Sequence, residues 1–331
     1  MTEARNQYER IARTRPPAKL NLFLELRSRR EDGFHEIDTV MIPIDWCDEL
    51  SVQRIPHTAI EMTVHWLPSK QIVAQRLGID IDSSTGASLL NIPSDASNLV
   101  HRALTSFQRA FQIEGGFSCH LGKRIPAGAG MGGASSDAAS ALRCAATLCD
   151  IPLDTPQLTE LAAAIGSDVP FFLGLGGETP ISGARATGRG EQITPINVAR
   201  KFDCVVVYPA VSLSTAEVYQ HSQIPLTPRD ATDLVEKLED ATMPDLSAVM
   251  MNRLTSPAKK LAPQIEEILE SLWQADLRVC QLTGSGSACF AIATSSSAAR
   301  QAALRLQSTR EPGALVTQTQ STHVPARIDV T

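Results

Sequence analysis

A run of glycines precedes an expected helix in the segment PAGAGMGGASSDAA at residues 126–139. Because the glycines between Gly128 and Gly133 carry no side chains, the backbone N–H groups of this turn can approach an anion closely. The alanine-rich helix that follows adds favourable partial charge at its N-terminus. The segment therefore predicts a loop that binds phosphate.

Two known phosphate-binding patterns can be compared with this segment. The P-loop pattern G-x-x-x-x-G-K-[ST] does not occur in the chain. Gly128 to Gly133 match G-x-G-x-x-G formally, and Asp150 follows about 20 residues on, as in a dinucleotide site. Such a site expects its glycines directly after a strand, whereas Pro126 precedes them here. A dinucleotide-dependent oxidoreductase is therefore the least favoured alternative.

A second candidate for chemistry lies near the N-terminus, in AKLNLFLEL at residues 18–26. Its leucines alternate with other residues, which is typical of a strand. Lys19 and Asn21 then share the opposite face of that strand. An amine and an amide on one face can reach the same pocket.

The remaining pattern predicts an α+β protein. Expected strands lie at 50–55, 61–67, 117–126, 205–209, 277–283 and 288–294, and expected helices at 97–111, 133–149, 155–166, 216–222, 232–238, 263–274 and 295–308. Residues 67–92 show no clear pattern. The predicted organisation is a flexible lead at 1–15, a domain at 16–197 and a second domain at 198–331.

Composition excludes several classes of protein. Lysine plus arginine number 30 against 36 aspartate plus glutamate, a formal charge of −6, so the basic excess of a nucleic-acid or membrane-surface protein is missing. No apolar run approaches the ~18 residues of a membrane span, and the N-terminus lacks a secretory signal. Seven scattered cysteines form no C-x-x-C pair. We expect a cytoplasmic chain with reduced cysteines.

Five segments taken together resemble one enzyme family. The glycine segment is similar to the phosphate-binding motif of the galactokinase, homoserine kinase, mevalonate kinase and phosphomevalonate kinase superfamily. Within that superfamily, the 4-diphosphocytidyl-2-C-methyl-D-erythritol kinases have the same ordered motifs, which here read PAKLNLFL at 17–24, DGFH at 32–35, GSDVPFF at 166–172 and LTGSGS at 282–287. The resemblance extends from about residue 16 to residue 295 and implies two lobes with the active site in the cleft between them.

The resemblance also implies roles for individual residues. Asp168 would accept or orient the proton of the acceptor hydroxyl, and Lys19 would stabilise the developing charge. ATP phosphates would bind the loop formed by Pro126, Ala127, Gly128, Ala129, Gly130, Met131, Gly132, Gly133, Ala134, Ser135 and Ser136. Substrate would contact Asn21, Phe34, His35, Tyr219, Gly284, Ser285 and Gly286, with His35 reading cytosine between Phe34 and Tyr219. Magnesium follows from the use of ATP, with Ser136 as the candidate ligand.

The implied activity is ATP-dependent phosphorylation of the 2-hydroxyl of 4-diphosphocytidyl-2-C-methyl-D-erythritol in the non-mevalonate pathway to isoprenoid precursors. Its expected partner is a small cytidine diphosphate compound, with no nucleic acid and no membrane, and the chain is either a monomer or a homodimer. Two alternatives stay open. One is a sister kinase that acts on mevalonate, homoserine or a sugar. The other is a catalytically silent sensor that binds nucleotide.

Overall fold

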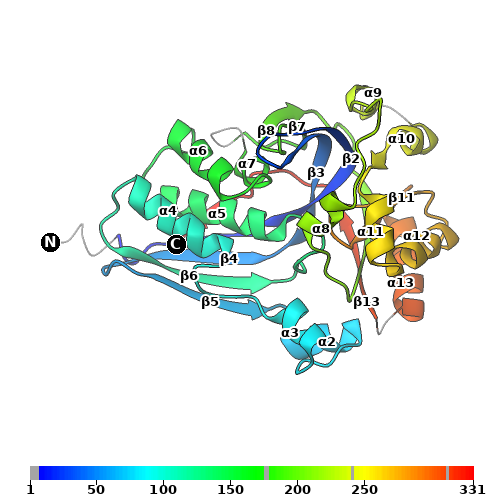
Figure 1. Cartoon of the computed structure of the whole chain (residues 1–331). Helices are drawn as coiled ribbons and strands as arrows, with labels where there is room; N and C mark the ends of the chain where they lie inside the picture. The colour runs from blue at the N-terminus through cyan, green and yellow to red at the C-terminus, as the bar shows by residue number, and fades with distance from the viewer. Residues whose placement is uncertain (1–6, 175–178, 240–241, 311–312) are drawn as a thin grey trace.

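The computed structural model describes residues 7–174, 179–239, 242–310 and 313–331. Figure 1 shows an α+β arrangement with two lobes, one around strands β4 to β6 and one around β11 to β13. The predicted α+β class is confirmed. Three sheets organise the described part of the chain, and long strands of the second sheet run from one lobe toward the other.

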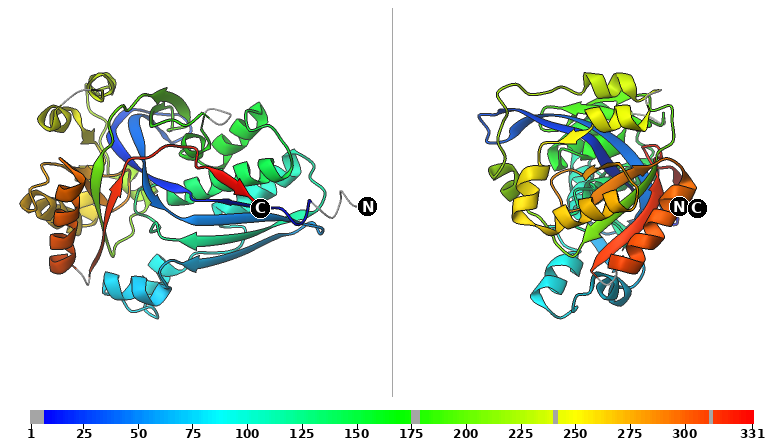
Figure 2. Two further views of the ribbon diagram at one scale, coloured as in Figure 1. Left: turned by 180° about the vertical axis from the view of Figure 1, so that it is seen from behind. Right: turned by 90° about the vertical axis from the view of Figure 1, so that its right-hand side faces the viewer.

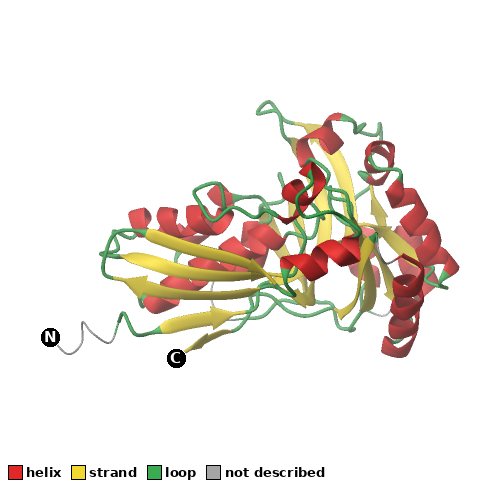
Figure 3. Ribbon diagram, turned by 90° about the horizontal axis from the view of Figure 1, so that it is seen from below, coloured by secondary structure: helices red, strands yellow, loops and turns green. Residues whose placement is uncertain are grey.

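The first sheet has helices on one face. Its order is β14-β1-β4-β6-β5, with β14 Ile328–Val330, β1 Ile11–Thr14, β4 Glu49–Ile55, β6 Gly116–Lys123 and β5 Ile60–Trp66. Helices α4 Leu99–Ala110 and α5 Gly133–Leu148 pack on this sheet, and Figure 3 shows helices behind its strands. Helix α6 Pro156–Ile165 packs on α4 and α5, and α7 Val169–Leu173 packs on α5 and α6. Asn98 starts α4 by accepting a hydrogen bond from the Val100 N–H at 2.9 Å. Alternating apolar residues of the strands form one core with these helices.

The second sheet contains the longest strands. Its order is β10-β2-β3-β7-β8, with β10 Met251–Asn252, β2 Pro17–Arg29, β3 His35–Cys47, β7 Gly183–Thr187 and β8 Gln192–Ile196. The β2 strand is buried on both faces from Pro17 to Leu26. Its polar residues Lys19, Asn21 and Glu25 are therefore inside the protein and need partners there.

The third sheet forms the second lobe. Its antiparallel order is β11-β12-β9-β13, with β11 Val279–Leu282, β12 Cys289–Ala293, β9 Asp203–Pro209 and β13 Ala314–Gln320. Helices α12 Gln264–Gln274 and α13 Ser296–Arg310 pack on this sheet, as the view in Figure 2 shows. The smaller helices of this half are α8 Thr215–Gln220, α9 Thr232–Lys237, α10 Met243–Val249 and α11 Thr255–Leu261.

The chain ends differ from the predicted organisation. Residues 1–6 lie outside the described residues, but Ile11–Thr14, predicted as part of a flexible lead, form β1. Residues 328–330, predicted in the second domain, form β14 and pair with β1 in the first sheet. β14 is the edge strand and β1 lies between it and β4, and such pairing of the two chain ends leaves no local sequence pattern.

The unpatterned stretch after Trp66 is also ordered. It forms α2 Lys70–Leu77 and α3 Ser84–Leu90, and α2 lies against β13. Among the described residues no helix is both long and apolar enough to cross a membrane.

Candidate active site

A cavity of about 930 Å³ opens where segments from all parts of the chain meet. The glycine loop, β2, the β2–β3 turn, the segment before α7, the β7–β8 turn, α8 and the β11–β12 turn all contribute to it. The predicted site residues that line it are Lys19, Asn21, Phe34, His35, Pro126 to Ser135, Asp168, Tyr219, Gly284 and Ser285. Segments that are far apart in sequence therefore form one site.

The glycine loop ends in a helix with free N–H groups. Gly132, at φ +69°, is the N-cap of α5 and has no side chain to accept a hydrogen bond. The first N–H to find a backbone acceptor is that of Ser136, which donates to Gly132 O at 2.9 Å. The N–H groups of Gly133, Ala134 and Ser135 have no acceptor within the helix, and all three residues line the cavity. This arrangement fits the phosphates of a nucleotide.

The glycine loop packs backbone to backbone against the β11–β12 turn. A Cβ at Gly130, which has φ +80°, would lie 2.1 Å from Thr283 O. A Cβ at Gly286 would lie 2.0 Å from Gly130 N, so neither position has room for a side chain. Gly286, predicted to touch substrate, therefore lies behind the loop instead of lining the cavity, because its role is this close approach.

Lys19 and Asp168 meet in the cavity. The Lys19 Nζ lies 3.7 Å from Asp168 Oδ2, although about 150 residues separate them in the chain. The same amine donates to Asn21 Oδ1 at 2.5 Å and to Gly130 O at 2.8 Å, which ties it to the glycine loop. Burial lowers the pKa of Lys19, and the Asp168 carboxylate opposes that shift. The Lys19 ammonium is thus held between the glycine loop and the Asp168 carboxylate.

Asn21 is fixed by two threonines that the sequence analysis did not single out. Its Nδ2 donates to Thr39 Oγ1 at 2.8 Å, and its backbone N–H donates to Thr283 Oγ1 at 3.1 Å. The Thr283 hydroxyl also donates to Asn21 Oδ1 at 3.3 Å, so the two threonines and Lys19 orient the side-chain amide. Only the pairing of β2 with β3 and the approach of the β11–β12 turn reveal these threonines.

Aromatic residues also line the cavity. Phe34, 53% exposed, stands on the turn between β2 and β3, and His35 begins β3. The His35 ring contacts Tyr219 of α8, with ring centroids 5.2 Å apart. Burial and the nearby Arg29 charge lower the pKa of His35, so its neutral ring offers one donor and one acceptor.

A buried ion cluster lies beneath the glycine loop. Lys123, at the end of β6, contacts the carboxylates of Asp48 and Asp137, the latter at 2.6 Å. Asp48 also accepts from the N–H of Ile125 at 2.9 Å. A Cβ at Gly133 would lie 3.4 Å from Lys123 Nζ. The cluster therefore ties the junction of β3 and β4, the end of β6 and the start of α5 together beneath the glycine loop.

Ser136 belongs to this buried layer and does not line the cavity. It is 0% exposed, and its Oγ has no hydrogen-bond partner within the part of the chain that the structure describes. The prediction of Ser136 as the magnesium ligand therefore stays untested, and its side chain, on the fourth residue of α5, is buried outside the cavity lining. No group of three or more histidine, cysteine or acidic residues among the described residues is placed to hold a metal. Magnesium bound with ATP needs only one or two protein oxygens besides the phosphates, so it stays a prediction, and no step below is derived through the metal.

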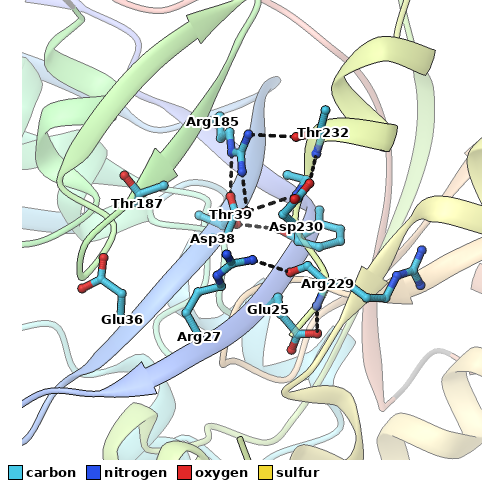
Figure 4. A network of polar contacts seen from close by, with 12 residues as sticks. Glu25, Arg27, Glu36, Asp38, Thr39, Arg185, Thr187, Arg229, Asp230 and Thr232 are labelled. Atoms are coloured by element: carbon cyan, nitrogen blue, oxygen red, sulfur yellow. Dashed lines mark hydrogen bonds and ion pairs between the residues drawn. The ribbon is translucent and has the colours of Figure 1, made fainter. Parts of the chain in front are cut away.

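A polar network fixes the wall of the cavity formed by the segment after α8. Figure 4 shows Asp38 of β3 pairing with Arg185 of β7, at 2.7 Å between Oδ2 and Nη2. Asp38 also accepts from the N–H of Ala231 at 3.1 Å, and Arg27 Nη1 donates to Arg229 O at 3.1 Å. The segment from α8 to α9 is thereby held against β2 and β3, and its residues Ser222 and Ile224 line the cavity.

The dinucleotide alternative fails on geometry. Asp150, which would bind the ribose, is exposed and pairs with Arg10 at 3.2 Å, outside the cavity lining. The glycine loop lies against Lys19 and Asp168 instead.

Comparison with known proteins agrees with this site. Residues 98–176 match the N-terminal domain of the GHMP kinases, and residues 232–311 match their C-terminal domain. A homoserine kinase from Cytophaga hutchinsonii has the same fold, with a TM-score of 0.66 at 16% identity over 97% of both chains. The two domain matches define the class, a small-molecule kinase of the GHMP type, which uses ATP.

Closer relatives narrow the class. The chain is 46% identical to the 4-diphosphocytidyl-2-C-methyl-D-erythritol kinase of Rhodopirellula baltica, over 96% of this chain and 97% of that protein. A crystal structure of 4-(cytidine 5'-diphospho)-2C-methyl-D-erythritol kinase matches with a TM-score of 0.71 and 31% identity, over 94% of this chain and 99% of that one. The chain belongs to the 4-diphosphocytidyl-2-C-methyl-D-erythritol kinase family.

Proposed function

We propose that the protein transfers the γ-phosphoryl group of ATP to the 2-hydroxyl of 4-diphosphocytidyl-2-C-methyl-D-erythritol. The contact between Lys19 and Asp168 carries this proposal, because it joins an amine and an acid at 3.7 Å beside the glycine loop. The Phe34 and His35 rings that line the same cavity support a cytidine compound as the acceptor.

Each site residue has its own role in the phosphoryl transfer. Asp168 takes the proton as the 2-hydroxyl oxygen bonds to the γ-phosphorus and the bond to the β–γ bridging oxygen breaks. Lys19 balances the charge that develops on the transferred group. The N–H groups of Gly133, Ala134 and Ser135 bind the phosphates that remain with the nucleotide. Magnesium stays a prediction, as the usual companion of ATP phosphates.

The base end of the cavity supplies selectivity. A neutral His35 can donate and accept at the edge of cytosine, and Phe34 offers a half-exposed ring on which a base can stack. Tyr219 supports the imidazole from α8. The substrate of a sister kinase for mevalonate or homoserine has no base that would bind Phe34 and His35.

A substrate panel tests the proposal. ATP consumption is measured with 4-diphosphocytidyl-2-C-methyl-D-erythritol, mevalonate, homoserine and galactose under identical conditions. We expect turnover with the cytidylated compound to exceed that with each of the others by at least about 10³-fold, since an unfilled polar site rejects analogues strongly. Equal turnover with mevalonate would favour a sister kinase, and ATP binding without any turnover would favour a sensor.

The pH profile tests Lys19 separately. Its pKa is lowered by burial, so the charged form that supports transfer is lost as pH rises through a value below the ordinary 10.5. We expect kcat to fall on the alkaline side with that apparent pKa. In Lys19→Arg, whose side chain stays protonated to above about pH 12, the remaining activity should keep no such alkaline limb. An identical limb in both proteins would assign it to another group.

A further inference from the structure

The turn between β7 and β8 contributes Arg189 to the cavity lining. Gly188 is held by β3, because its N–H donates to Glu36 Oε1 at 3.0 Å and its carbonyl accepts from the Ile37 N–H at 2.8 Å. Figure 4 shows Glu36 and Thr187 on the neighbouring ends of β3 and β7 that carry this turn. The turn is therefore fixed next to His35.

The same turn reaches the catalytic acid. A Cβ at Gly190 would lie 3.7 Å from Ser167 Cβ and 4.0 Å from Asp168 Oδ1. Gly190 has φ +112°, a backbone conformation that other residues rarely adopt. The backbone of Arg189, the residue before Gly190, therefore lies near Asp168.

The Arg189 side chain points toward the base end. Its guanidinium carbon lies 5.2 Å from the centre of the Phe34 ring, and the residue lines the cavity. Its contact with Glu191 is long, 3.8 Å between Nε and Oε2. Over the described ranges the guanidinium makes no hydrogen bond, so its five donors remain available to a ligand.

The carboxylates nearest to Arg189, those of Glu191 and Asp32, do not line the cavity, whereas the guanidinium-bearing residue does. Asp168 balances Lys19, whereas Arg29 and Arg189 line the cavity on the base side. In a cytidine diphosphate compound, the diphosphate lies between the base and the alcohol. With the base at Phe34 and the alcohol at Asp168, the diphosphate must pass Arg189.

We propose that Arg189 binds the diphosphate of the acceptor substrate and selects cytidine diphosphate compounds over cytidine itself. The proposal rests on the proposed function, since it uses the base end and the acceptor end assigned there. Guanidinium binds phosphate oxygens with paired hydrogen bonds, which an ammonium cannot reproduce.

Binding of cytidine, CMP and CDP tests this role. Affinities are measured by calorimetry with a non-hydrolysable ATP analogue saturating the glycine loop, so that CDP cannot bind there. In the unchanged protein we expect affinity to rise from cytidine to CDP. In Arg189→Met, cytidine affinity should stay the same while CDP affinity falls about 10- to 100-fold, the effect of a charged hydrogen bond. The CDP affinity of Arg189→Lys should lie between that of the unchanged protein and that of Arg189→Met.

A matched control removes a distant charge. Arg300→Met, on the exposed side of α13, loses one arginine far from the cavity lining and should change none of the three affinities. If Arg189→Met still binds CDP more tightly than cytidine by the same factor as the unchanged protein, the role of Arg189 is overturned while the proposed function stands. If the unchanged protein binds none of the three compounds, the cytidine site itself is rejected, and this proposal with it.

Discussion

Asp168→Asn should lower kcat by about 10³-fold, within the range of positioned acid–base groups. The amide keeps the size of the carboxylate but cannot take the proton of the acceptor hydroxyl. Because Asp168 is about one-third exposed and pairs with Lys19 only at 3.7 Å, its replacement should leave the fold intact. Steady-state ATP consumption measures the loss, and a thermal melt checks folding.

The control for this variant is Asp150→Asn. Asp150 lies on the surface with Arg10 and outside the cavity, so its replacement should leave kcat and ATP affinity unchanged. ATP affinity should also survive in Asp168→Asn, because the glycine loop is untouched. Turnover within a few-fold of normal in Asp168→Asn would remove the acid from the mechanism.

Lys123→Met should cost about 3 to 5 kcal/mol of unfolding free energy, as expected when one partner of a buried ion pair is lost. The variant leaves the carboxylates of Asp48 and Asp137 buried without their shared cation. Burial already raises the pKa of Asp137, and the Asp48 charge adds to this, whereas Lys123 opposes it. Urea denaturation measures the change, and ATP affinity should fall because the cluster lies under the loop.

Two further variants keep this prediction testable. Lys123→Met combined with Asp137→Asn removes one of the two stranded charges, and we expect it to be more stable than Lys123→Met alone. Arg327→Met breaks an exposed pair with Asp329 and should change stability by less than about 1 kcal/mol. If Lys123→Met is no more harmful than Arg327→Met, the cluster does not hold the loop.

Local patterns accounted for most of the elements. The alternation in residues 18–26 predicted the strand that carries Lys19, and the glycine run predicted the start of α5. These predictions succeed because strand alternation and the helix start depend on neighbours within a few residues. The pairing of Lys19 with Asp168 was expected only from the family resemblance.

Burial and long-range packing decided what the sequence patterns missed. Ser136 stands among the loop residues in sequence, yet the direction of α5 turns it beneath the phosphate site. Gly286 belongs to a turn expected to touch substrate, yet it packs on the backbone of Gly130. Both outcomes depend on how two distant segments approach each other, which no local pattern encodes.

The sequence by itself therefore determined the kinds of residue at the site and the strands and helices that carry most of them. Only the tertiary structure decided which side chains face the cavity, that Arg189 lies beside the Phe34 ring, and that β1 and β14 join the ends of the chain. The physical reason is that periodicity reports on neighbours along the chain, whereas a cavity is defined by the packing of sheets and turns that meet only on folding.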